Sequence, residues 1–154
     1  MTYSIRPVER ADIDGIKTVL DSCELFPSEY LDEMIADYFN NPETEERWFT
    51  CINENKPSAI GYCVPEKFTS GTYNLLAIGV AKCDQRKGIA NAMMTYIEQV
   101  LKSKDARILI VETSSDSAQE GARKLYNKLG YSQEATIREF WNEGEDKIVF
   151  WKKL

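Results

Sequence analysis

The chain has 154 residues, of which 43% are hydrophobic and 29% are charged, a composition typical of a soluble globular domain. Its 25 acidic and 19 basic residues give a net charge of −6, which argues against a protein that binds nucleic-acid backbones. The chain has no histidine, which excludes Ser-His-Asp and Cys-His catalysis, histidine general bases and HExxH zinc sites. Any chemistry must therefore use carboxylates, tyrosine, lysine, backbone groups or water.

The first 42 residues are predicted to form a strand and two helices. Tyr3–Pro7 is expected to be a short strand, and apolar residues at helical spacing predict an amphipathic helix over about 10–22. A second helix is expected to begin with Ser28 as its N-cap. It should end before Pro42, because the residue before a proline is pushed out of the helical region.

Strands and helices alternate through the rest of the chain. A hairpin is expected from strands 48–52 and 58–64, and the apolar run over 73–80 is typical of a strand buried on both faces. The later elements are a helix over 88–103, a buried strand over 107–112, a helix with Ser117 and Glu120 as a capping box and Gly130 as its C′ glycine, and strands over about 131–140 and 147–153. This order predicts one mixed α/β domain over residues 1–154.

The cysteines and the apolar segments indicate a cytoplasmic protein. Cys23, Cys51, Cys63 and Cys83 contain no C-x-x-C pair, so we expect reduced thiols and no metal site. No stretch approaches the roughly 18 apolar residues of a membrane helix, and the start of the chain lacks a signal-peptide core. We therefore expect neither a membrane nor a nucleic acid as a partner.

The segment from Val80 to Ala90 leaves a strand and opens a helix. Gly88 lets the backbone approach a ligand closely, and the first free N–H groups of a helix attract anions. Lys82, Arg86 and Lys87, set against one acid, give residues 81–90 a net charge of +2. These features suit a pyrophosphate. A solvated basic loop, with a small residue for packing, explains them equally well.

Two motifs in this chain resemble those of the GNAT superfamily of N-acetyltransferases. Gln85 to Ala90 read Q-x-x-G-x-A, similar to the acyl-CoA motif Q/R-x-x-G-x-G/A, and neither a P-loop nor a dinucleotide fingerprint is present. Ala122 to Tyr131 resemble the A-x-x-L/F-Y-x-K-x-G-F/Y segment of that superfamily. The order of elements also agrees over nearly the whole chain. The resemblance implies a GNAT-like acyl-CoA transferase fold, with a mostly antiparallel mixed sheet of about seven strands and about four helices.

The resemblance also implies a reaction and a set of site residues. An acyltransferase of this family moves the acetyl group of acetyl-CoA directly to a primary amine, without a metal. Tyr126 would act as general acid beside the sulfur, although a tyrosine here can equally be a packing residue. The residues expected to bind the cofactor are Ile78, Gly79 and Val80 along the pantetheine arm, and Gln85, Arg86, Lys87, Gly88, Ile89 and Ala90 around the pyrophosphate.

The sequence departs from the family pattern at two positions. Gln119 stands where the family often has an asparagine that contacts the cofactor, and Lys82 stands where a proline often follows the strand. Because glutamine keeps an amide, we still expect Gln119 to contact the cofactor.

The general base is the least defined part of the site. Glu112 is the leading candidate, since apolar neighbours at the end of a buried strand would raise its pKa. It can equally serve as a hydrogen-bond partner for the SSDS loop that follows, and ordered water can replace a side chain as the base. Glu24 and Glu139 are weaker candidates.

The charge distribution points to a cationic acceptor. Residues 1–50 hold 12 acids and 4 bases, whereas the remainder holds 13 acids and 15 bases. In the resembled family the first two helices wall the acceptor site, so an acidic wall would attract a small cationic amine. Solvated acidic helix faces are the alternative explanation. Aromatic side chains that can line the pocket, or else pack in the core, are Phe26, Tyr30, Tyr38 and Trp141.

Three other functions stay open at this point. A regulatory module can bind acyl-CoA without catalysis, a related enzyme can acetylate a protein or peptide amine, and an unrelated α/β domain would prefer ATP or NAD. The sequence does not identify the acceptor amine, and it does not show whether acyl groups other than acetyl are used. A homodimer is among the expected states, because homodimers are common in the resembled superfamily.

Overall fold

The computed structural model describes residues 3–154, and within this range the chain forms seven strands and four α-helices. The family-like fold predicted above is confirmed, including the mixed sheet. In chain order the elements are β1 (Tyr3–Pro7), α1 (Ile13–Cys23), α2 (Leu31–Asn40), β2 (Arg47–Asn53), β3 (Lys56–Pro65), β4 (Thr72–Val80), α3 (Ile89–Ser103), β5 (Ile108–Ser114), α4 (Glu120–Lys128), β6 (Ser132–Asn142) and β7 (Glu145–Lys153). Four 3-10 helices accompany them, η1 (Arg10–Asp12), η2 (Ser28–Tyr30), η3 (Lys82–Asp84) and η4 (Ser117–Gln119).

The strands follow the order β1-β2-β3-β4-β5-β7-β6. The pairs β1–β2, β2–β3, β5–β7 and β6–β7 are antiparallel, whereas β4 and β5 are parallel. The parallel register runs from Thr72 opposite Ile108 to Leu75 opposite Val111. A parallel pair needs a crossover connection, and α3 supplies it here.

The chain divides into two compact units, which are described separately. The first unit comprises Met1–Val64 and Leu76–Val100, and the second comprises Pro65–Leu75 and Leu101–Leu154. The prediction of a single domain over residues 1–154 stays a prediction. None of the helices in residues 3–154 combines the length and the apolar character needed to span a membrane.

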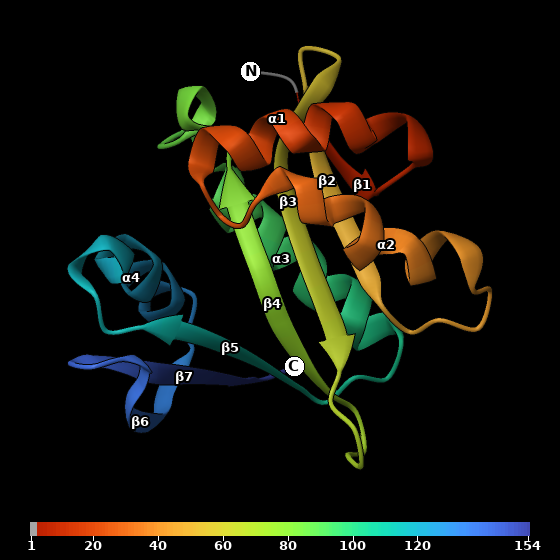
Figure 1. Ribbon diagram of the computed structural model, residues 1–154. Helices are drawn as coiled ribbons and strands as arrows, with labels where there is room; N and C mark the ends of the chain where they lie inside the picture. Colours follow the sequence, from red (N-terminus) through yellow and green to blue (C-terminus); the bar gives the residue numbers. More distant parts are fainter. Residues whose placement is uncertain (1–2) are drawn as a thin grey trace. The chain divides into compact units, whose positions relative to one another are not determined.

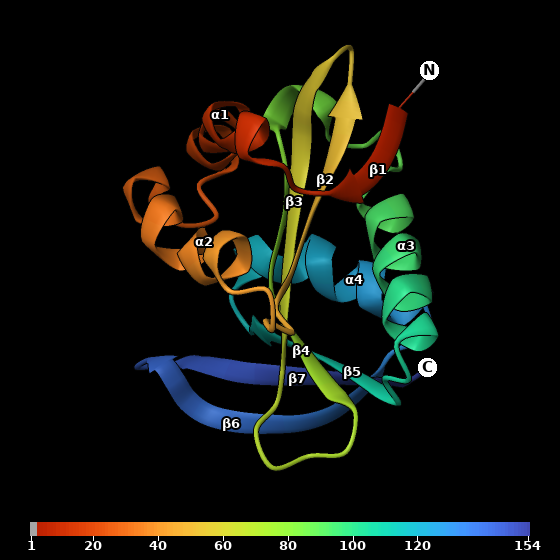
Figure 2. The ribbon, with the colours of Figure 1, turned by 90° about the vertical axis from the view of Figure 1, so that its right-hand side faces the viewer.

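In the first unit, helices cover both faces of the sheet. Figures 1 and 2 show α1 and α2 on one face of β1–β3 and α3 on the other. On the first face the apolar stripes of both helices pack over Trp48, whose ring is stacked on Tyr62 at 3.8 Å between centroids. On the other face Gly61 makes room for α3, because a Cβ atom at this position would lie 2.9 Å from Ile97 Cδ1. The helices are thus held by side chains that alternate along the strands.

In the second unit, α4 packs on one face of the β5–β7–β6 sheet. The Tyr126 ring of α4 lies 5.4 Å from the ring of Phe150 on β7. Along β5 the side chains of Leu109, Val111 and Thr113 are buried, and those between them are half-buried. The buried strand expected over 107–112 is thus fully buried only at alternate residues. The strand has one packed face because α4 covers one side of it.

The structure corrects three further local predictions. Ser28 begins η2, so it is not the N-cap of α2; that position belongs to Tyr30. Ser117 lies inside η4, which is capped by the Asp116 side chain accepting from the Ala118 N–H. In both places a 3-10 turn precedes the helix, which moves the cap away from the first favourable residue. On β4 the Leu76 side chain is 49% exposed, so this strand is not buried throughout.

Candidate active site

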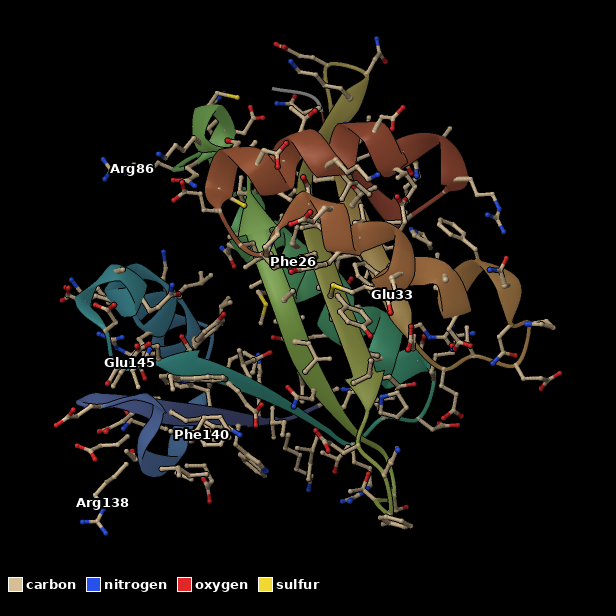
Figure 3. All side chains as sticks on the ribbon, viewed as in Figure 1. Phe26, Glu33, Arg86, Arg138, Phe140 and Glu145 are labelled. Carbon is tan, nitrogen blue, oxygen red and sulfur yellow. The ribbon has the colours of Figure 1, made fainter. Side chains whose placement is uncertain are left out.

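The loop between β4 and α3 leaves open space beside Gly88 in the first unit. The backbone passes through positive φ at Arg86 (62°) and Gly88 (82°), after η3 has reversed its direction. A Cβ atom on Gly88 would meet no other atom within 4 Å, so the glycine is required by its backbone conformation and not by packing. Arg86 extends away from the loop, as Figure 3 shows. Open space beside free helix N–H groups and an extended guanidinium fits an anion.

Hydrogen bonds fix this loop at its beginning. The Ala81 N–H donates to Ser58 O at 2.8 Å, and the Lys82 N–H donates to Ser22 Oγ at 2.7 Å. The Gln85 side-chain amide donates to Val80 O at 3.0 Å. The motif glutamine therefore turns back onto the end of β4, where it stabilises the reversal of the chain.

Ile78, Gly79 and Val80 form the last three residues of β4. Gly79 faces the end of α1: a Cβ atom there would lie 3.0 Å from Cys23 Sγ and 3.1 Å from Leu25 Cδ2. The glycine thus allows α1 to pack closely against β4. Ile89 is buried as the first residue of α3, and Ala90 is half-buried beside it.

In the second unit, Tyr126 is buried in α4 at 3% exposure. Its ring lies 5.9 Å from Tyr131 as well as 5.4 Å from Phe150. Burial raises the pKa of the Tyr126 hydroxyl to about 12. The hydroxyl therefore stays protonated throughout the physiological range and can act as a hydrogen-bond donor.

Glu112 does not have the apolar surroundings that made it the leading candidate for the base. Its Oε2 lies 2.6 Å from Lys147 Nζ, and the Lys147 ammonium lies 4.3 Å from the Phe140 ring centroid. The register of β5 with β7 explains the ion pair, because Glu112 and Lys147 are diagonal neighbours on one face of the sheet. A residue that follows 35 positions later in the chain thus engages the carboxylate.

Gln119 and the weaker candidates for the base lie at exposed positions. Gln119 is the last residue of η4 and the N-cap of α4, with its backbone N–H bonded to Asp116 O. Glu24 is the left-handed C-cap of α1 in the first unit. Glu139 lies on β6 in the second unit, at a φ of 53°.

The four aromatic candidates for an acceptor pocket have different roles. Tyr38 donates a hydrogen bond to Val8 O at 3.0 Å, and Phe26 packs against the core of the first unit. Tyr30 is 53% exposed. Trp141 is 44% exposed in the second unit, where its Nε1 donates to Thr113 O at 3.2 Å.

The cofactor residues near Gln85–Ala90 thus belong to the first unit, and Tyr126, Glu112 and Gln119 belong to the second. Sequence reasoning missed Asp84, a buried acid in the basic loop. It also missed Lys147 as the partner of Glu112. The only signal for Asp84 was its charge, opposite to that of its neighbours, and the sequence held no signal for Lys147.

Over residues 3–154, a seven-stranded mixed sheet with helices on both faces of its first unit (Figures 1 and 2), and a glycine-containing loop between β4 and α3, defines an α/β protein. The chain belongs to the Acetyltransferase (GNAT) family, whose model matches residues 16–131. It is therefore an acyltransferase. No curated protein sequence matches the chain closely enough to indicate a relative.

Solved structures show the same fold at low sequence identity. A chain from Desulfovibrio desulfuricans assigned to the GNAT family superposes with a TM-score of 0.91 at 22% identity, over 99% of both chains. The ribosomal-protein-S18-alanine N-acetyltransferase of Escherichia coli gives a TM-score of 0.79 at 18% identity, covering 99% of this chain and 94% of that one. An aminoglycoside 6′-N-acetyltransferase complexed with coenzyme A gives 0.79 at 14% identity, covering 97% and 96%. The last two of these structures are named for different kinds of acceptor, a ribosomal protein and an aminoglycoside.

Proposed function

We propose that this chain transfers the acetyl group of acetyl-CoA directly to a primary amine of a small cationic molecule. The observation that carries the choice of acceptor is the acidic surface of α1, η2 and α2, on which Figure 3 labels Glu33. Lys17 is engaged by Asp32 at 2.7 Å. The exposed acids of this surface are Asp14, Asp21, Glu24, Glu29, Asp32, Glu33 and Asp37.

The loop before α3 supports the assignment of the cofactor. Its Gly88 leaves open space, and its backbone N–H groups from Arg86 to Ala90 would hold the diphosphate. Ile78, Gly79 and Val80 lie beyond the last residues of β4 that pair with β5, so their backbone is assigned to the pantetheine arm. In the second unit, the side-chain amide of Gln119 is assigned to the cofactor.

Acetyl-CoA supplies an acyl group that is already activated, so a neutral amine can attack it without a covalent enzyme intermediate. The Val80 N–H is assigned to the thioester carbonyl, where it would stabilise the developing oxyanion. Tyr126 is assigned to the sulfur. Because its pKa is about 12, against roughly 8.5 for a thiol, it would stabilise the departing thiolate by donating a hydrogen bond instead of giving up its proton.

The incoming ammonium must lose a proton before it can attack. We assign this step to ordered water, because the Glu112 carboxylate is already engaged by Lys147 at 2.6 Å. Glu112 then has a structural role at the end of β5. A Glu112→Gln variant that lost most of its rate at every pH would instead favour Glu112 as the base.

A cytoplasmic location is part of the proposal. All four cysteines, Cys23, Cys51, Cys63 and Cys83, are free thiols. Unpaired cysteines are typical of proteins from reducing compartments.

The first experiment measures acetyl-CoA binding by calorimetry, and then thiol release with three acceptors: a linear polyamine, an alkylamine with a single amino group and a peptide with an N-terminal alanine. We expect the polyamine to give the highest kcat/KM. Preference for the peptide would replace this proposal with a protein N-acetyltransferase. Binding without thiol release for any acceptor would favour a regulatory module.

A matched pair of variants tests the acidic surface. Glu29→Gln/Glu33→Gln should lower kcat/KM for the polyamine about threefold to tenfold and reduce its dependence on salt, since screened surface charges mainly steer encounter. The control Glu54→Gln removes an exposed acid from the β2–β3 turn and should change neither quantity. If the double variant and the Glu54→Gln control had equal effects, the acidic surface would not select the acceptor.

A further inference from the structure

One acidic side chain is buried in the basic loop that precedes α3. Asp84 is only 7% exposed, whereas Lys82, Cys83 and the three residues from Gln85 to Lys87 are all exposed. A carboxylate loses its hydration on burial, so hydrogen bonds or an opposite charge must compensate for that loss. The partners of Asp84 therefore show which parts of the molecule it connects.

Asp84 joins the loop to the end of strand β2. The side-chain amide of Asn53, the last residue of β2, donates a hydrogen bond of 3.2 Å to Asp84 Oδ1. Asn53 is itself 6% exposed and is paired in the sheet with Tyr3 and Lys56. The loop cannot leave this position without separating two buried polar groups, which is unfavourable. The contact thus ties the loop to the sheet of the first unit.

Asp84 also holds side chains of the loop itself. Lys87 Nζ lies 3.3 Å from Asp84 Oδ1, and Cys83 Sγ lies 3.6 Å from Oδ2. Arg86, between them in the sequence, extends away from the loop instead (Figure 3). The Asp84 carboxylate therefore contacts two exposed residues of the loop, Cys83 and Lys87, which lie on either side of Arg86, where φ is positive.

The other contacts of the loop act at its beginning. The bonds to Ser58 and Ser22 hold Ala81 and Lys82, and Asp84 holds the residues that follow. A left-handed conformation is unfavourable at a residue other than glycine, so Arg86 keeps it only where surrounding contacts enforce it. The Asp84 cluster provides such contacts.

We propose that Asp84 is a positioning residue that fixes the Arg86–Ala90 backbone in the conformation that accepts the diphosphate of acetyl-CoA. The inference rests on the proposed assignment of that cofactor to this loop. Asp84 acts through Asn53 and Lys87 and does not itself contact the cofactor, because its carboxylate would repel the phosphates. Its effect should therefore fall on donors that carry the diphosphate and not on the acetyl-transfer step.

The test measures the kinetics of two acetyl donors with the wild-type protein and with the Asp84→Ala variant. S-acetylpantetheine has the same thioester as acetyl-CoA but lacks the diphosphate. For acetyl-CoA we expect KM to rise about tenfold with kcat within about twofold, as for loss of one hydrogen bond to a charged group. The Kd of CoA in calorimetry should rise by the same factor. For S-acetylpantetheine, kcat/KM should be that of the wild-type protein.

Exchanging the amide of Asn53 and the carboxylate of Asp84 provides an independent test. Asn53→Asp brings two buried carboxylates together, and it should raise the KM of acetyl-CoA at least as much as Asp84→Ala. Adding Asp84→Asn restores the hydrogen bond between the two residues with its direction reversed but not the ion pair with Lys87, so the double variant should recover only part of the loss. A role in folding alone would not produce this recovery together with the selectivity between donors.

The control is Thr50→Val in β2, the strand that also carries Asn53. This change removes a buried hydrogen bond of 2.8 Å from the Thr50 hydroxyl to Ala59 O on β3. This variant should be less stable but should keep the wild-type KM for both donors. Equal changes for both donors in Asp84→Ala, or no change for either, would overturn the inference. A wild-type protein that neither binds nor uses acetyl-CoA would overturn the cofactor assignment first, and this outcome is recognisable without any variant.

Discussion

At the scale of single residues, Tyr126 has the environment that its proposed role needs. The side chain is buried against Phe150 and Tyr131, which keeps the ring in place and the hydroxyl protonated. A phenol with a pKa of about 12 keeps its proton across the physiological pH range and can donate a hydrogen bond there. The tyrosine therefore serves both packing and the proposed chemistry, and these two roles are separable because only one of them needs the oxygen.

Tyr126→Phe separates the two roles. We expect kcat to fall about 10- to 100-fold, the effect of losing a hydrogen bond to a developing thiolate, with little change in the Kd of acetyl-CoA. The control Tyr96→Phe removes a hydroxyl from a half-buried ring of the first unit, which packs on Phe49, and should keep the wild-type kcat. Wild-type kcat in the Tyr126 variant would show that this tyrosine has a packing role only.

At the scale of elements, the motif Tyr126…Gly130-Tyr131 forms the end of helix α4. The Tyr131 N–H bonds to Tyr126 O at 3.0 Å, and the Gly130 N–H bonds to Asn127 O at 3.2 Å. These two bonds, with Gly130 at a φ of 89° and the contact between the two tyrosine rings, constitute a Schellman motif. Lys152 Nζ also donates to Leu129 O at 2.8 Å. The cap thus orients the ring of Tyr126 through its hydrophobic contact.

The glycines at the two ends of α4, Gly121 inside the helix and Gly130 just beyond its C-cap, should respond to alanine with opposite signs. Gly130→Ala forces a side chain into left-handed geometry and should lower the free energy of unfolding by about 1–2 kcal/mol. Gly121→Ala lies within the helix, where a Cβ atom meets no other atom within 4 Å, and should raise it by about 0.5–1 kcal/mol. Urea unfolding measures both changes in the free energy of unfolding. Changes of the same sign in the two variants would contradict this argument from backbone conformation.

At the scale of the whole molecule, the absence of histidine leaves few groups to titrate near neutral pH. Burial raises the pKa values of Tyr62, Cys63 and Tyr126 to about 12, from ordinary values of 10, 9 and 10. At the acidic end, hydrogen bonds from Arg6 lower the pKa of Asp12. Stability should therefore vary little between about pH 5 and 8 and fall on both sides.

The direction of each change follows from which state holds the proton more tightly. The three raised groups stabilise the folded chain fully below about pH 9 and lose this contribution toward pH 12, because the unfolded chain ionises first. Each should lower the free energy of unfolding by about 1.4 kcal/mol per pH unit in this range. Asp12 stabilises the folded chain above its ordinary pKa of 3.8, and this stabilisation is lost as the pH falls through its lower pKa in the folded state.

Unfolding in urea over a pH series measures this profile. Tyr126→Phe should reduce the alkaline slope by about 1.4 kcal/mol per pH unit, and Asp12→Asn should flatten the acidic side. An unchanged alkaline slope in the tyrosine variant would contradict the raised pKa.

The sequence by itself determined the order of the elements, the positions of the two family motifs and the need for glycine at residues 88 and 130. These features are local: they depend on hydrophobic periodicity, on turn geometry and on short spacings along the chain. The predictions that failed, such as Ser28 and Ser117 as caps, concern element boundaries, where several neighbouring residues can satisfy the same backbone groups.

Only the tertiary structure decided which charged and polar side chains contact each other. Glu112 and Lys147 are 35 positions apart and pair because β5 and β7 are adjacent, and Asp84 meets Asn53 because β2 ends beside the loop that follows β4. The tertiary structure also raised the pKa of Tyr126, through rings contributed by residues 131 and 150. Electrostatic and packing contacts depend on distance in space, and a chain pattern carries no information about which distant residues become neighbours.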